Sequence, residues 1–203
     1  MRMFTPVAIV HDHTMAHVAS ALRGVLEAFH LRVDFYRMVQ LRQVRSFFAS
    51  PSIFYEYMVI LAHGSGDTEE DRHIAFDVVD QKDGKYEEPE GWESVTYKLT
   101  PAEIAKSARR PGGALLSLAC GSGREPIARA FLERGFRAYI GPYTTYYNTD
   151  SGLLFFINFF YHMRSDDRDY CTVIRSEREA FELAAGTDPE FECGPRVFRY
   201  YGG

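Results

Sequence analysis

The strongest constraint on the fold comes from three short runs in which every residue, or nearly every residue, is apolar. They occupy residues 7–10, 57–62 and 114–119. Such runs are too short for the helices of a globular domain. Their uniform apolar character is typical of strands that are buried on both faces of a parallel sheet. We therefore expect these three runs to be buried strands.

Apolar residues at helical spacing fill most of the chain between these runs. Further strands are expected at 31–36 and 136–140, with a closing edge strand at 196–200. Helices are expected at 14–29, 39–48, 100–110, 124–134, 151–163 and 172–185. Strands that alternate with helices predict an α/β fold of three layers, in which helices cover both faces of a mostly parallel sheet.

Two local signals refine this outline. Residues 73–99 hold two strand-like segments around a charged stretch that contains glycine, which predicts a small hairpin outside the main sheet. Thr100 and Glu103 form a capping box with proline at the first helical position, and Thr14 is a candidate N-cap for the first helix. We expect residues 1–203 to form one domain with the hairpin as an insertion.

Charge and composition argue against several functions. The net charge of −5 is spread along the chain without a basic face, so nucleic acid is not an expected ligand. The apolar stretch at 153–161 is far shorter than the ~20 residues that cross a bilayer, so no membrane span is expected. The three cysteines fit neither a disulfide framework nor a zinc site, which favours a reduced, cytoplasmic protein. His13 and His17 lack a third metal ligand, and neither a dinucleotide fingerprint nor a Walker A sequence is present, so no metal or cofactor is expected.

The candidate catalytic residues are His63 and Cys120. Each is the first residue after a buried apolar run, and each is followed by glycine. Because the carboxyl ends of parallel strands meet at one edge of a sheet, the two side chains are expected to lie close together. A thiolate is favoured before a helix N-terminus, and an imidazole can serve as base and then as acid in amide hydrolysis. The backbone N–H groups of Gly64 and Cys120 are candidates for an oxyanion hole.

These segments resemble the signature of the caspase-like cysteine peptidases, which include caspases, metacaspases, gingipains, separases and bacterial CHAT domains. That signature is a hydrophobic block ending in His-Gly and a later block ending in Ala-Cys, which read MVILAHG and LLSLACGSG here. The text ARAFLERGFRAYIGPY after the cysteine looks like the CHAT version. Leu118 departs from the acidic residue that metacaspases carry two positions before the cysteine, and the resemblance ends near residue 163.

The resemblance implies a caspase-like fold and a cysteine endopeptidase. Such an enzyme hydrolyses peptide bonds in protein or peptide substrates through a Cys-His dyad and an acyl-enzyme intermediate. Related bacterial domains often act with partners encoded nearby, so a regulatory protein partner is also implied.

Two acidic residues are candidates for substrate binding. Asp12 follows the first strand, and Asp150 lies in the aromatic loop after the cysteine. The resemblance implies that the first specificity pocket is built from these loops. A partly desolvated carboxylate there favours cleavage after arginine or lysine. The alternative is that each aspartate caps a helix. Tyr143, Tyr146 and Tyr147 either line the substrate groove or pack under the loop.

Two other functions stay open at the level of sequence. The chain can be a catalytically silent caspase-fold interaction module that acts through partner binding, because a cysteine after an apolar run is often an ordinary core residue. A Rossmann-like nucleotide binder is the weaker alternative, since the glycine pattern of that fold is missing.

Overall fold

A six-stranded sheet forms the centre of the molecule. The computed structural model describes residues 6–51, 54–66, 68, 71–81, 92–110, 112–163, 175–187 and 197–202. The strand order is β2-β1-β3-β7-β8-β9. The strands are β1 (Pro6–His11), β2 (Arg32–Arg37), β3 (Tyr57–Leu61), β7 (Ala114–Ser117), β8 (Ala138–Pro142) and β9 (Phe198–Gly202). All neighbouring strands pair in parallel except β9, which runs antiparallel to β8. The three apolar runs are β1, β3 and β7, so their prediction as buried strands is confirmed.

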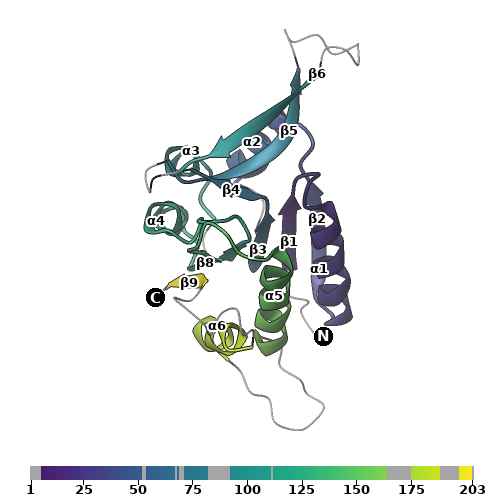
Figure 1. The fold of residues 1–203 in the computed structure, drawn as a ribbon, viewed down its shortest axis with the longest axis vertical. Coiled ribbons are helices and arrows are strands. Elements are labelled where there is room, and N and C mark those ends of the chain that lie inside the picture. Colours follow the sequence, from purple (N-terminus) through teal and green to yellow (C-terminus); the bar gives the residue numbers. More distant parts are fainter. Residues whose placement is uncertain are drawn as a thin grey trace.

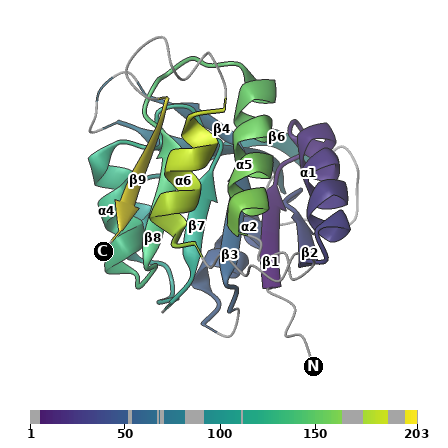
Figure 2. The ribbon, with the colours of Figure 1, turned by 90° about the horizontal axis from the view of Figure 1, so that it is seen from below.

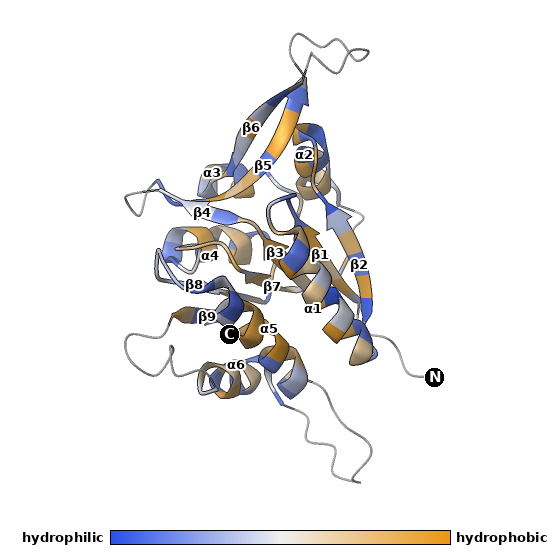
Figure 3. Ribbon diagram, turned by 45° about the vertical axis from the view of Figure 1, so that its right-hand side comes forward, coloured by the Kyte–Doolittle hydropathy of each residue, from blue (hydrophilic) through white to orange (hydrophobic). Residues whose placement is uncertain are grey.

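Helices cover both faces of this sheet, as the strand and helix pattern predicts (Figures 1 and 2). One face is covered by α1 (Ala16–Ala28), α5 (Thr149–Met163) and α6 (Glu177–Ala185). The other is covered by α2 (Leu41–Ala49), α3 (Pro101–Ala105) and α4 (Glu125–Glu133). Residues of β3 alternate between the two cores: Val59 packs with the first set of helices and Ile60 with the second. Figure 3 shows the apolar residues of α5, the helix that supplies four buried phenylalanines to the first core.

A second, smaller sheet carries the predicted hairpin. Its strands are β4 (His63–Ser65), β5 (His73–Gln81) and β6 (Trp92–Leu99), all antiparallel, in the order β4-β5-β6. The hairpin β5–β6 lies outside the main sheet, as expected. The short strand β4 was not predicted. Only Ala62 separates β3 from β4, so the chain passes directly from the main sheet into the second one.

Several predicted boundaries are wrong. The helix expected at 100–110 ends at Ala105, because the backbone N–H of Ala108 donates to Phe48 and that of Arg110 to Arg134 instead of continuing the helix. Thr14 is not the N-cap of α1; Met15 holds that position and makes no side-chain capping bond. Half of the predicted capping box is confirmed, because the Thr100 hydroxyl accepts from the Glu103 N–H at 3.2 Å. The Glu103 carboxylate instead accepts from Lys106 and Tyr97.

Some expected elements reach beyond the described part of the chain. The helix predicted at 172–185 corresponds to α6 from Glu177 onward, and residues 172–174 lie outside the described residues. The edge strand predicted at 196–200 is β9, two residues later, and residue 196 also lies outside them. Among the helices that the structure describes, none is both long and apolar enough to cross a bilayer.

Candidate active site

The candidate residues follow three neighbouring strands at the same edge of the main sheet. Strand β1 leads to Asp12 and Thr14, β3 to His63 and β7 to Cys120, and β3 pairs with both of the other strands. The chain turns outward from β1 to β2 and then returns on the other side to β3, so the strand order reverses between β1 and β3. Ligands of open α/β sheets bind at such a reversal, beyond the carboxyl ends of the strands.

Direct backbone contact joins the histidine segment to the cysteine. A methyl group built on Gly64 would lie 1.8 Å from the carbonyl oxygen of Cys120 and 2.5 Å from its nitrogen. Real side chains do not approach backbone atoms so closely, and glycine is therefore the residue that this position accepts. The structure thus brings the two segments together, and the peptide groups of Gly64 and Cys120 lie side by side.

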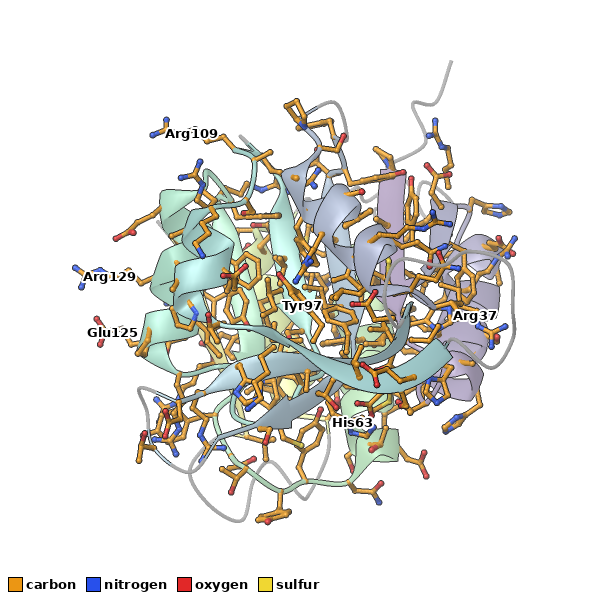
Figure 4. The ribbon with its side chains drawn as sticks, turned by 90° about the horizontal axis from the view of Figure 1, so that it is seen from above. Arg37, His63, Tyr97, Arg109, Glu125 and Arg129 are labelled. Carbon is orange, nitrogen blue, oxygen red and sulfur yellow. The ribbon has the colours of Figure 1, made fainter. Side chains whose placement is uncertain are left out.

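A chain of hydrogen bonds runs from Asp12 through Thr14 to the Nε2 atom of the His63 imidazole. Thr14 Oγ1 donates to Asp12 Oδ1 at 2.5 Å and lies 3.1 Å from His63 Nε2. Because the hydroxyl proton of Thr14 is engaged by Asp12, the contact with His63 is satisfied when Nε2 carries the proton and donates it to Thr14. In a neutral imidazole the free lone pair then sits on Nδ1. The ring is exposed to solvent, beside the β5–β6 ribbon in Figure 4.

The carboxylate of Asp12 is fully buried and surrounded by donors. It accepts from Thr14 N at 3.0 Å, Thr14 Oγ1, Met15 N at 3.3 Å and Asp77 N at 3.0 Å. Buried carboxylates are stable when their lone pairs are filled in this way. These bonds close the turn that leads into α1, whose N-cap is Met15, and add one bond to β5, so Asp12 does not cap the helix itself. The predicted role of Asp12 in binding a basic substrate side chain gains no support from it.

Asp150 lies in the first turn of α5 and is exposed. The helix begins at Thr149, and the Asp150 N–H donates to Asn148 Oδ1 at 2.9 Å. Asp150 is therefore not the cap, so that alternative is wrong. Its carboxylate faces solvent, and its role in substrate binding stays a prediction.

The thiol of Cys120 is half-buried. Burial raises the pKa of this thiol above its ordinary value, while its own backbone N–H and the guanidinium of Arg72 act in the opposite direction. The expected helix N-terminus does not adjoin it, because α4 begins at Glu125 and four residues intervene. A helix dipole acts mainly within the first turn, so this separation in the sequence gives no support to the expected activation of the thiol by the dipole.

The turn after the cysteine is tied to the aromatic loop. Gly121 adopts a φ of 69°, and its N–H donates to the Thr144 carbonyl at 2.8 Å. Tyr147 donates its hydroxyl proton to the carbonyl oxygen of Leu118. Tyr147 therefore packs under the loop and fixes the strand end before Cys120, whereas Tyr146 is 91% exposed and free to meet a ligand. Tyr143 stacks beneath the guanidinium of Arg124, at 4.4 Å.

Sequence reasoning missed Arg72, which follows the loop after β4. Its side chain crosses Gly121: the Nη1 atom lies 3.1 Å, and Cδ 3.3 Å, from where a methyl group on Gly121 would be. Arg72 is only 9% exposed, and its Nε is buried without a hydrogen-bond partner. Arg72 ends the acidic sequence DTEEDR, which is typical of a solvated surface segment, so the sequence does not indicate that this side chain is buried beside Gly121.

A second concave region lies at the opposite edge of the main sheet. It is a cavity of about 490 Å³ near the amino ends of β3 and β8. Its central cation, Arg137, pairs with Glu56 at 2.6 Å and with Glu177 at 2.5 Å, so these charges satisfy one another. Among the described residues, no group of three or more His, Cys, Asp or Glu side chains is placed to hold a metal ion.

Comparisons of the chain with models of known protein families and with curated proteins find no match.

Proposed function

We propose that this chain is a caspase-like cysteine endopeptidase in which Cys120 is the nucleophile and His63 the general base. The observation that carries the proposal is the backbone contact between Gly64 and Cys120, which puts the two strand ends against each other. The exposed imidazole, the half-buried thiol and the position at the reversal of strand order support it.

The protonation states suggest the order of the steps. His63 Nδ1 accepts the proton of the Cys120 thiol as sulfur attacks the carbonyl carbon of a peptide bond. The oxyanion receives hydrogen bonds from the N–H groups of Gly64 and Cys120. The imidazolium then protonates the departing amine, which leaves a thioester on Cys120. Water, deprotonated by His63, hydrolyses this thioester, releases the carboxylic acid and restores the thiol.

The raised pKa of Cys120 makes the base essential in this scheme. A preformed thiolate would retain some reactivity without His63, whereas a neutral thiol needs a proton acceptor at the moment of attack. We therefore expect His63→Ala to abolish cleavage almost as completely as Cys120→Ala.

The test is cleavage of an unfolded protein and of a peptide library by the wild type and by Cys120→Ala. Cys171→Ala and Cys193→Ala are matched controls, because they make the same chemical change elsewhere in the chain. Loss of cleavage in the first variant alone, with an unchanged circular dichroism spectrum, supports the proposal. Cleavage that persists in Cys120→Ala would refute it.

The partial burial of the Cys120 thiol, which raises its pKa, favours the alternative of a silent interaction module. A thiol-reactive peptide probe separates the two functions. Labelling of Cys120 that depends on His63 supports the enzyme, and labelling that is the same with and without His63 supports the module.

A further inference from the structure

The face of the molecule that carries α2, α3 and α4 holds a cluster of cations that the proposed mechanism does not use. We call this cluster the basic surface, and its members are Arg42, Arg45, Lys106, Arg109 and Arg134. All are exposed except the last, which is partly buried, and α2 has no acidic residue. The chain as a whole has a net charge of −5, so the fold gathers cations that the sequence spreads among anions. The absence of a basic face, expected from the sequence, is therefore corrected.

Contacts between separate segments join these cations into one surface. The N–H of Ala108 donates to the Phe48 carbonyl at 3.0 Å, which ties the chain after α3 to the end of α2. Arg134 Nη1 donates to the Ala105 carbonyl at 3.1 Å, which ties the end of α4 to the end of α3. Figure 4 shows this face, with Arg109 pointing into solvent at its rim.

Three of the cations have no partner of opposite charge. Within the described ranges, no ion pair joins Arg45, Arg109 or Arg134 to a carboxylate, and the Nε of Arg134 is buried without a hydrogen-bond partner. The neighbouring carboxylate of Glu103 is already engaged by Lys106 at 2.6 Å. Cations that are held close together repel one another, and an acidic group from outside the chain would relieve this repulsion.

An exposed phenylalanine borders the same surface. The side chain of Phe54 is 57% exposed, and its ring lies 3.9 Å from the place of a methyl group on Gly112. The N–H of Gly112 donates to the carbonyl of Gly135, the residue after Arg134, at 3.0 Å. An aromatic side chain beside arginines is the composition of the centres of protein interfaces, in which lysine is depleted. The surface thus offers an apolar anchor as well as positive charge.

The charge of the whole chain selects among acidic partners. Nucleic acids and anionic membranes present long arrays of negative charge, and the net charge of −5 repels such arrays outside the basic surface. A short acidic segment of a protein meets the basic surface alone. An apolar side chain within that segment can then cover Phe54.

We propose that the basic surface and Phe54 bind an acidic segment of a partner protein, in which an apolar side chain lies among aspartates and glutamates. This inference does not depend on the proposed peptidase function. Gly112, beside Phe54, precedes β7, whereas Cys120 follows it, so the anchor lies toward the opposite edge of the main sheet from the candidate nucleophile.

The test measures the binding of fluorescent peptides to the Cys120→Ala chain, which under the proposed function cannot cleave them. The first peptide has glutamates around a central leucine. In the second, alanine replaces the leucine, and in the third, glutamine replaces every glutamate. The first peptide should bind at least about 5-fold more tightly than the second, and its affinity should fall as salt is added.

Variants assign each preference to its side chains. Phe54→Ala should remove the preference for leucine over alanine and keep the preference for glutamate over glutamine. Arg45→Gln combined with Arg109→Gln should weaken binding of the first peptide by about 2- to 30-fold and leave the glutamine peptide unaffected. Arg23→Gln is the matched control, because it removes an exposed arginine from α1 on the opposite face, and it should change neither preference.

Four results would overturn the inference. The first is that the glutamate and leucine peptide shows no saturable binding. The second is that Arg23→Gln weakens binding as much as the double arginine variant, and the third is that the preference for leucine persists in Phe54→Ala. The fourth is tighter binding of single-stranded DNA or of phosphatidylserine vesicles that depends on the same arginines, because the surface would then bind an extended polyanion. The replaced side chains are exposed, so an unchanged circular dichroism spectrum is expected for every variant.

Discussion

The link from Asp12 through Thr14 to His63 predicts a specific result for Thr14→Val. Valine keeps the branched shape of threonine and removes only the hydroxyl that donates to Asp12 and contacts His63 Nε2. The backbone N–H of residue 14, which also donates to Asp12, is retained.

The expected loss of stability follows from the count of donors. A hydrogen bond to a charged group contributes about 1.5–3 kcal/mol. Asp12 keeps three of its four donors, so we expect a value at or below the lower limit of that range, about 1–1.5 kcal/mol. For a chain of this size this corresponds to a fall in Tm of about 2–6 °C. Calorimetry or a thermal scan by circular dichroism measures it.

The expected loss of rate follows from the freed imidazole. A neutral hydrogen bond contributes about 0.5–1.5 kcal/mol, which corresponds to a fall in kcat of about 2- to 13-fold if the bond holds the ring and its tautomer in place. Thr14→Ser keeps the hydroxyl and should restore most of the rate. Equal rates in the serine and valine variants would refute this role of Thr14, even if both variants were less stable.

Three further predictions concern individual residues. In denaturant unfolding, Gly64→Ala should destabilise the fold by about 3 kcal/mol or more, because the new methyl group meets backbone atoms of Cys120. The control Gly24→Ala, whose methyl group has nothing within 4 Å, should be neutral or stabilising by up to about 1 kcal/mol. Similar values for the two variants would contradict the close approach of Gly64 to Cys120. Burial lowers the pKa of His11, so the folded state loses stability as the pH falls from the ordinary value of 6.5 toward the lowered pKa. His11→Gln should therefore make the unfolding free energy less dependent on pH in that range. An unchanged slope would show that His11 does not cause this pH dependence. The rate of Cys120 alkylation by iodoacetamide should stay low at neutral pH and increase only at pH values above the ordinary pKa range of cysteine, because burial raises the pKa of the thiol. Rapid labelling of Cys120 at neutral pH in His63→Ala would contradict this expectation.

The fold was largely predictable because its central strands are continuous apolar runs. Residues 57–61 and 114–117 are apolar on both faces apart from Ser117, and such runs are typical of buried parallel strands. Strand β4 escaped prediction, since His63-Gly64-Ser65 has neither periodicity nor branched residues and becomes a strand only by pairing with β5. The end of α3 was also missed, because it depends on backbone bonds to distant residues rather than on a local stop signal.

The meeting of the histidine and cysteine segments was predictable for a similar reason, because adjacent parallel strands bring their carboxyl ends together. The groups around them were not. The contact between Thr14 and His63 spans 49 positions, and that between Arg72 and Gly121 joins the loop before β5 to the turn after β7. The helix expected at 124–134 spans Glu125–Glu133, so the four residues between Cys120 and this helix could already be counted from the sequence.

The two candidate catalytic residues are positioned by different sheets. Cys120 follows a strand of the main sheet, whereas His63 opens β4, whose register is set by Ala75 of β5. The Asp77 N–H anchors the same strand β5 to Asp12. The imidazole and the carboxylate at the start of the hydrogen-bond chain that reaches it are therefore both attached to β5. The hairpin thus acts as a shared support for the base and for the groups that orient it.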